Sequence, residues 1–236
     1  MSSGSVMLQV ADLHAWYGES HVLHGMTFEV NRGELVTLLG RNGAGRTSTL
    51  KAVLNLTDRR RGSIALEGRD LMGLPPHRVA RLGIGYCPEE RGIFASLSAE
   101  ENLLLPPHVS DGGMGVEEIY AMFPNLYERR KSPGNRLSGG EQQMLALARI
   151  LRTGARLLLL DEITEGLAPV IVKALGKAIH HLKEKDYTIV MADQNFRFAA
   201  PLADRHYVVE RGRIAQTVTK DALSASMGML HDYLGV

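Results

Sequence analysis

A glycine-rich segment from Gly40 to Thr47 is the part of this sequence whose residue types most clearly suggest chemistry. It reads Gly-Arg-Asn-Gly-Ala-Gly-Arg-Thr and matches the phosphate-binding pattern G-x-x-x-x-G-K-[ST] everywhere except at the lysine, where Arg46 stands. Glycines let backbone N–H groups turn toward a phosphate, and the Thr47 hydroxyl can ligate Mg²⁺. A tight glycine turn without a ligand is the competing explanation. We expect the phosphates of a nucleotide to be held by the following residues: Gly40, Arg41, Asn42, Gly43, Ala44, Gly45, Arg46, Thr47 and Ser48.

The arginine at position 46 keeps the positive charge of the usual lysine but not its geometry. Lysine is a compact point charge, whereas arginine is planar and forked and can hold two phosphate oxygens at once. We therefore expect nucleotide binding to survive and the terminal phosphate to shift. Because a displacement of about 1 Å can cost about a hundredfold in rate, we predict slowed hydrolysis.

Two adjacent carboxylates, Asp161 and Glu162, follow a run of four leucines. A buried strand that ends in Asp161 would point its carboxylate toward the phosphate loop on the neighbouring strand, where Asp161 suits Mg²⁺ together with Thr47. The alternative is that both acids are solvated surface charges in a loop.

A second glycine-rich segment, Leu137–Gln143, reads Leu-Ser-Gly-Gly-Glu-Gln-Gln. Ser138 and Glu141 alone would fit a capping box at the start of a helix, but a capping box does not require the glycines at 139 and 140. The chain thus offers two helix N-termini suited to anions but only one set of magnesium and base candidates.

With all three motifs in one chain, the sequence resembles the ATP-binding cassette (ABC) proteins over nearly its whole length. The resemblance implies an ATPase that binds ATP and Mg²⁺. It also implies an ATP-dependent dimer, because in this family the signature segment of one subunit closes over the γ-phosphate held by the phosphate loop of another. Ser138 and Gly140 would then act in trans, and the nucleotide-binding candidates in this segment are Ser138, Gly139, Gly140 and Glu141.

The same resemblance gives roles to single side chains outside the glycine-rich segments. Glu162 would polarise the attacking water, and Tyr17 would stack on adenine, although Tyr17 also fits a core or surface aromatic. Glu89 stands where most members carry glutamine, and Gln194 where most carry a histidine that contacts the γ-phosphate. A carboxylate at Glu89 would repel phosphate unless Mg²⁺ or water intervenes, and the Gln194 amide can donate a hydrogen bond without carrying charge. The catalytic candidates are Glu162, Gln194 and Glu89, and the magnesium candidates are Thr47, Asp161 and Glu89.

The pattern of apolar residues predicts an α/β fold that positions these motifs at the ends of buried strands. Alternation over Met7–Val30 predicts an antiparallel meander, and Leu35–Leu39 predicts a strand that leads through the phosphate loop into a helix over Thr47–Leu56. Further strands are expected at Ser63–Leu66, Ile84–Cys87, Leu157–Leu160, Thr188–Ala192 and Tyr207–Val209. Further helices are expected at Ser98–Leu105, Val116–Phe123, Ser138–Leu151 and Pro169–Leu182.

Strands that alternate with helices predict a mostly parallel sheet covered on both faces. We interpret residues 1–236 as a single ABC nucleotide-binding domain: a P-loop NTPase core with an N-terminal antiparallel β meander. A helical signature subdomain is expected to be inserted at about residues 88–156.

Composition excludes several classes of protein. The 236 residues carry 27 basic and 26 acidic side chains, so neither a nucleic-acid-binding stripe nor a polybasic membrane anchor is expected. The single cysteine, Cys87, fits a small buried residue in a reducing compartment. Met1–Val10 lacks the pattern of a signal peptide and no segment is apolar enough to span a membrane, so a membrane link is expected only through a partner.

One branch of the family is similar in further detail. Glu165–Pro169, Gln194–Asn195 and Tyr233–Val236 resemble the ATPases of branched-chain amino acid uptake systems, whose relatives handle other small polar solutes such as urea or amides. This resemblance implies an importer subunit at the cytoplasmic face of the inner membrane. Its partners would be transmembrane permease subunits, a second cassette that is identical or different, and indirectly a periplasmic solute-binding protein.

Two other functions compete with an actively hydrolysing importer subunit. Arg46 and Gln194 favour a subunit that binds ATP, hydrolyses it weakly and serves as the dimer partner of a more active cassette. Soluble ABC proteins of translation or DNA repair are disfavoured, because they carry tandem cassettes or a long coiled coil that this length does not accommodate.

Overall fold

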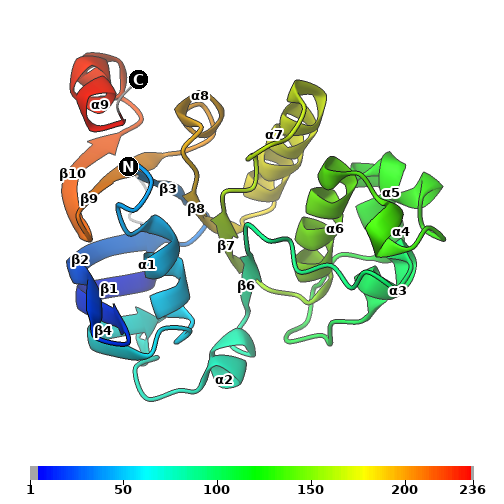
Figure 1. Cartoon of the computed structure of the whole chain (residues 1–236), viewed down its shortest axis with the longest axis horizontal. Helices are drawn as coiled ribbons and strands as arrows, with labels where there is room; N and C mark the ends of the chain where they lie inside the picture. Colours follow the sequence, from blue (N-terminus) through cyan, green and yellow to red (C-terminus); the bar gives the residue numbers. More distant parts are fainter. Residues whose placement is uncertain (1–4, 235–236) are drawn as a thin grey trace.

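Two sheets of different kinds form the framework of the chain in the computed structural model, which describes residues 5–234 (Figure 1). One sheet has four strands in the order β2-β1-β4-β5, and the other has six in the order β10-β9-β3-β8-β7-β6. Residues 1–4 lie outside the described part, and so do residues 235–236, the last two of the Tyr233–Val236 segment that resembles the branched-chain group.

The four-stranded sheet is antiparallel. Its strands are β1 (Val6–Tyr17), β2 (Ser20–Asn31), β4 (Arg59–Leu66) and β5 (Arg69–Asp70). In β1 and β2 the residues that face the core alternate with exposed ones, as expected for a sheet with one buried face. The expected N-terminal meander is confirmed, and β4 joins it beside β1.

The six-stranded sheet is parallel except at one edge. Its parallel strands are β3 (Leu35–Leu39), β6 (Ile84–Cys87), β7 (Leu157–Asp161), β8 (Thr188–Ala192) and β9 (Arg205–Glu210). Strand β10 (Arg213–Thr219) pairs antiparallel with β9. Every residue of β3, β7 and β8 is buried, because both faces of these strands are covered.

One detail of the expected arrangement is wrong. The strand that ends in Asp161 is not the neighbour of the strand that precedes the phosphate loop, because β8 lies between β7 and β3. Residue periodicity predicts that a strand is buried but not its place in the sheet, so the order could not be obtained from the sequence. The carboxyl ends of β3 and β7 still lie at one edge of the sheet.

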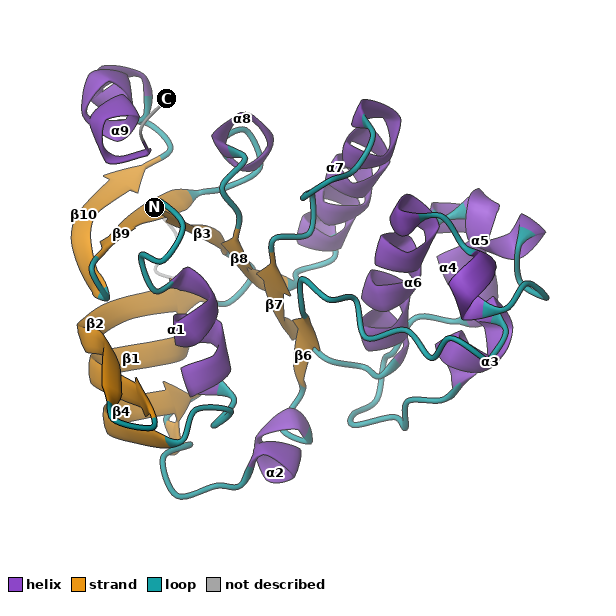
Figure 2. Ribbon diagram, viewed as in Figure 1, coloured by secondary structure: helices purple, strands orange, loops and turns teal. Residues whose placement is uncertain are grey.

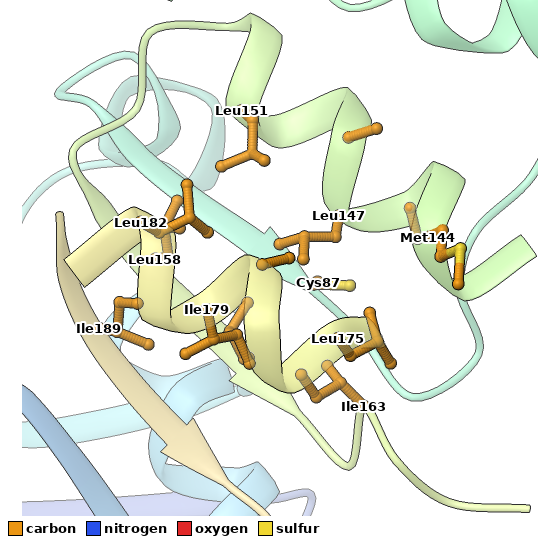
Figure 3. Close-up of a cluster of buried hydrophobic side chains, with 14 of the residues drawn as sticks. Cys87, Met144, Leu147, Leu151, Leu158, Ile163, Leu175, Ile179, Leu182 and Ile189 are labelled. Atoms are coloured by element: carbon orange, nitrogen blue, oxygen red, sulfur yellow. The ribbon is translucent and has the colours of Figure 1, made fainter. Parts of the chain in front are cut away.

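Successive residues of the central strands pack into two separate cores. On one face Leu158, Leu160 and Ile189 pack against α6 (Gly139–Arg152) and α7 (Pro169–Glu184), with Cys87 buried among them (Figure 3). On the other face Leu157, Leu159 and Val190 pack against α1 (Arg46–Val53) and the antiparallel sheet. The parallel sheet therefore lies between two helices and a layer of mixed structure.

The remaining helices are short. Those near α6 are α3 (Ala99–Leu104), α4 (Val116–Met122), α5 (Pro124–Glu128) and the 3₁₀ turn Gly134–Arg136, which gather on the side of the molecule away from the antiparallel sheet (Figure 2). The others are α2 (Pro76–Ala80), α8 (Phe196–Ala199), the 3₁₀ turn Ser224–Ser226 and α9 (Met227–Leu234). Within the described residues, each helix is too short or too polar to cross a lipid bilayer. The assignment of residues 88–156 to an inserted subdomain stays a prediction.

Candidate functional site

A cavity of about 630 Å³ lies beside the phosphate loop, within the size range of ordinary ligand sites. The loop contributes residues 42–48 to its wall. Tyr17, Glu89 and Glu162 join them from three other parts of the chain. The structure thus brings together candidates from four separate segments of the sequence.

The phosphate loop connects β3 to α1 and is held by a second turn. Gly43 and Gly45 have φ values of 78° and 111°, which L side chains rarely adopt. The N–H of Gly212, in the turn between β9 and β10, donates a hydrogen bond of 2.8 Å to the carbonyl of Ala44. Helix α1 begins directly after Gly45, so the unpaired N–H groups of its first turn lie at the loop and suit a phosphate.

Arg46 pairs with the candidate base instead of extending freely into the cavity. Its guanidinium donates to Oε1 of Glu162, to the carbonyl of Gly40 and, at 3.2 Å, to Oδ1 of Asn42. Arg46 is 5% exposed and Glu162 is 7% exposed, so the two charges form a buried ion pair. The planar fork permits this set of contacts, which a lysine ammonium could not make in the same geometry.

The backbone and the charge of Glu162 are both unusual. Its φ of 47° lies in the left-handed region, a strained conformation that is often found at functional sites. Its Oε2 accepts a hydrogen bond of 3.1 Å from the N–H of Gln194. Burial raises the pKa of Glu162 to about 7, while the positive charge of Arg46 acts in the opposite direction. Glu162 is therefore a carboxyl group whose protonation depends on how Arg46 is placed.

Asp161 is 1% exposed, and each of its carboxylate oxygens accepts a hydroxyl hydrogen bond. Oδ1 accepts from Thr47 at 2.9 Å, and Oδ2 accepts from Tyr86 at 3.0 Å. Burial raises the pKa of Asp161, and the two hydroxyl bonds oppose that shift. The Asp161 carboxylate thus contacts Thr47 of the phosphate loop directly, although β8 separates their strands.

This pair of side chains fits a magnesium ion that arrives with a nucleotide. A hydroxyl and a carboxylate are oxygen ligands of the kind Mg²⁺ prefers, and Mg²⁺ commonly takes its other ligands from phosphates and water. Among the described residues no group of three or more His, Cys, Asp or Glu side chains could hold a metal alone. Glu89 is exposed and lines the cavity, where it could face such an ion.

Comparison with known proteins identifies the family. The sequence profile of the ABC transporter family matches residues 23–165. The chain belongs to the ABC transporter family. It is an ATP-binding subunit and an ATPase of that family, as its three motifs predict.

Individual ABC relatives align with the chain over almost its whole length. It is 38% identical to the high-affinity branched-chain amino acid transport ATP-binding protein BraG of Pseudomonas aeruginosa, over 97% of this chain and 100% of the relative. It is 32% identical to the lipopolysaccharide export system ATP-binding protein LptB of Escherichia coli, over 97% of each chain. A solved ATP-binding subunit of an ABC transporter superposes with a TM-score of 0.80 at 28% identity, covering 98% of this chain and 100% of that one. The ABC ATPase fold and the resemblance to the branched-chain group are both confirmed.

The ABC signature lies outside the cavity. Ser138 is exposed and caps α6, its hydroxyl accepting from the N–H of Glu141 while the Glu141 carboxylate accepts from the N–H of Ser138. Gly139 and Gly140 form the first turn of that helix, and Gly140 packs so closely on Ile171 that a methyl group there would collide with it. None of these four residues is among those that line the cavity in the described part of the chain.

Gln194 and Arg41 are two further candidates whose side chains do not line the cavity beside the phosphate loop. The side chain of Gln194 is exposed, and its contact with Glu162 is made by the backbone. The loop that holds it is anchored by the hydroxyl of Thr164, which donates to the buried carboxylate of Asp193 at 2.9 Å. Arg41 lines a second cavity on another side of the phosphate loop. The roles of both residues stay predictions.

Several residues at the site were missed by reasoning from sequence. Tyr86 looked like an ordinary strand residue, since nothing in its spacing indicates a bond to Asp161. His21, His24 and Arg211 also line the cavity. They come from β2 and from the turn after β9, and no local motif connects these segments with the phosphate loop. Only the folded chain brings them there.

Proposed function

We propose that this ABC ATPase hydrolyses Mg²⁺-ATP to drive uptake of branched-chain amino acids or similar small polar solutes. The observation that carries the hydrolytic part is that Thr47 and Glu162 line one cavity beside the phosphate loop while the buried carboxylate of Asp161 is bonded to the hydroxyl of Thr47. The full-length similarity to BraG supports the solute class. The similarity to LptB, whose name describes export, makes the direction of transport a point for experiment.

The residues predicted from the sequence would each have a task in this reaction. Backbone N–H groups of the phosphate loop would hold the phosphates, Thr47 and Asp161 would hold Mg²⁺, and Tyr17 would stack on adenine. Mg²⁺ bound with ATP supplies positive charge against the phosphate oxygens. Glu162 would orient and polarise the attacking water, which requires its carboxylate to be released from Arg46. Glu89 and Gln194 would act at the γ-phosphate through water or a neutral hydrogen bond.

A second cassette would complete the site. Ser138 and the two glycines after it form a helix N-terminus suited to an anion, yet they do not line the cavity of their own chain. A dimer in which each signature covers the partner's nucleotide uses both features. Such a pair would bind transmembrane permease subunits at the cytoplasmic face of the inner membrane and meet a periplasmic solute-binding protein only through the permease.

The buried ion pair favours a second candidate function. All three acceptors around the Arg46 guanidinium belong to the chain itself, and one of them is the candidate base. A cassette that keeps this pair intact would bind ATP and hold the dimer together while a different cassette supplied most of the turnover. The two candidate functions therefore differ in the expected rate of ATP hydrolysis, whereas both require ATP binding.

Transport by the reconstituted complex tests the proposal. We expect liposomes that contain the chain with its permease subunits and solute-binding protein to accumulate radiolabelled leucine in an ATP-dependent manner, and the same complex with Glu162→Gln to accumulate none. ATP turnover without uptake of any aliphatic amino acid would reject the solute class and leave the ATPase assignment standing. Efflux of the solute in the same assay would reject the importer direction.

A further inference from the structure

Tyr86 contacts Asp161, one of the magnesium candidates, and none of the sequence motifs gives Tyr86 a role. It lies in β6, and its hydroxyl donates to Oδ2 of Asp161 at 3.0 Å. We propose that Tyr86 is a positioning residue that fixes the rotation of the Asp161 carboxylate for Mg²⁺. The proposal deepens the assignment of Thr47 and Asp161 to the metal and rests on it.

The carboxylate of Asp161 is held from both sides by the chain. Thr47 donates to Oδ1 at 2.9 Å while Tyr86 donates to Oδ2, and Asp161 is almost completely shielded from solvent. Each carboxylate oxygen has two lone pairs, so each keeps one free after these hydroxyl bonds. Because the two donors approach different oxygens, they fix the plane of the carboxylate and hence the direction of the free lone pairs. A carboxylate held by Thr47 alone could rotate about its Cβ–Cγ bond.

The position of Tyr86 within a paired strand holds its side chain in place beside Asp161. Strands β6 and β7 are parallel neighbours, with Tyr86 paired to Leu159 and Cys87 paired to Leu160. Tyr86 packs against the core that also contains Leu159, so its ring is held by the sheet and not by a loop. Glu89 follows only three residues later and lines the cavity, so β6 places the Tyr86 hydroxyl close in sequence to the point where the chain enters the site.

Tyr86→Phe tests this role because it removes the hydroxyl and keeps the ring. Binding of a non-hydrolysable ATP analogue would be titrated in EDTA and at increasing Mg²⁺ concentrations, with thermal denaturation to confirm folding. Loss of a residue that orients a metal ligand costs about tenfold or more in metal affinity. We therefore expect unchanged analogue affinity in EDTA and a midpoint for Mg²⁺ about tenfold higher than in the wild-type protein. A wild-type Mg²⁺ midpoint in Tyr86→Phe would overturn the proposal.

Tyr207→Phe is the matched control. Tyr207 is a buried strand tyrosine whose hydroxyl donates to the carbonyl of Glu29 at 2.8 Å, and it does not line the cavity. Its loss is expected to lower the melting temperature without moving the Mg²⁺ midpoint. An equal shift of the midpoint in Tyr207→Phe would show that Tyr86 acts only through stability.

A third variant distinguishes a failure of the role of Tyr86 from a failure of the proposed magnesium site at Thr47 and Asp161. Asp161→Asn is expected to remove most of the Mg²⁺ dependence of analogue binding. If Asp161→Asn responds to Mg²⁺ like the wild-type protein, the magnesium site itself is wrong and the role of Tyr86 falls with it. If Asp161→Asn loses the response while Tyr86→Phe keeps it, only the role of Tyr86 is rejected.

Discussion

Arg46 is the residue that we expect to influence the turnover of this cassette most. A charged group that is buried needs partners, and Arg46 finds them in the carbonyl of Gly40, the amide oxygen of Asn42 and the carboxylate of Glu162. Removal of one partner from a buried pair is costly, because the other charge is left without compensation. The same contacts that stabilise the phosphate loop therefore occupy the candidate base.

Replacement of Arg46 by lysine should raise the turnover of ATP. A lysine ammonium is compact and cannot span the three acceptors in the manner of the guanidinium, so Glu162 becomes free to orient water. We expect phosphate release at saturating Mg²⁺-ATP to rise by about tenfold to a hundredfold, with little change in nucleotide affinity. The matched control is Arg32→Lys, since Arg32 is exposed and pairs with Glu67 outside the cavity. Turnover of Arg46→Lys equal to that of Arg32→Lys would refute the explanation.

At this scale the sequence located the reactive groups but not their contacts. The phosphate loop, Asp161 and Glu162 could be found because their spacing reflects backbone geometry that glycines and strand ends impose. The Arg46–Glu162 pair and the Tyr86–Asp161 bond could not, because they join residues 116 and 75 positions apart that only the sheet brings together.

At the scale of elements, the turn between β9 and β10 acts as a support for the phosphate loop. Gly212 has a φ of 71°, accepts the N–H of His24 at 2.9 Å and donates to Ala44 at 2.8 Å. A Cβ atom at Gly212 would lie 2.4 Å from the carbonyl oxygen of Val22. The turn is therefore fitted between β2 and the phosphate loop, and it has no room for a side chain.

Gly212→Ala is expected to weaken nucleotide binding as well as stability. The clash with Val22 displaces the turn and with it the hydrogen bond to Ala44, so we expect about tenfold weaker binding of an ATP analogue and a melting temperature lower by about 5 °C or more. Gly68→Ala is the matched control, because Gly68 has a similar φ of 79° but open space around its Cα. Its cost should be about 1 kcal/mol from backbone strain, with no effect on binding. Equal effects of the two substitutions on binding would contradict this account.

The elements themselves were predictable to the extent that they carry periodicity or caps. Helix α6 begins at a capping box and β3 is apolar except for Thr37, and both were found from sequence with ends close to those observed. Helices α2 and α8 were missed because they span five and four residues, too short for a helical period to appear. Strand order was not predictable either, since β8 enters between β3 and β7 through packing of the whole sheet.

At the scale of the whole molecule, a buried histidine ties folding stability to pH. His206 in β9 is fully buried and shares a hydrogen bond of 2.7 Å with the hydroxyl of Thr37 in β3, while its Nε2 has no hydrogen-bond partner in the described structure. Burial lowers the pKa of His206 from 6.5 to about 4, although nearby Asp204 acts in the opposite direction. The folded protein thus takes up this proton only in acid.

The free energy of unfolding should fall between pH 6.5 and about 4 because of His206. In this window the unfolded chain binds the proton and the folded chain does not, so acid favours the unfolded state, whereas above pH 6.5 the full stability is present. We expect the free energy of unfolding, measured with urea, to fall between pH 7.5 and pH 5 by about 1–2 kcal/mol more in the wild-type protein than in His206→Gln. Parallel pH profiles of the two proteins would contradict the assignment. The difference between them also removes the contributions of the buried carboxylates, which both proteins share.

Within the described residues, the cavity beside the phosphate loop is lined without the signature residues Ser138–Glu141, which is why the proposed activity depends on a second cassette. In the proposed reaction Glu162 in this cavity polarises the water that hydrolyses ATP. The most direct test is phosphate release by the assembled permease complex with wild-type chain and with Glu162→Gln, with ATP binding measured on the same samples. We predict that both complexes bind Mg²⁺-ATP and that only the wild-type complex releases phosphate. Release at the wild-type rate by Glu162→Gln would contradict the claim.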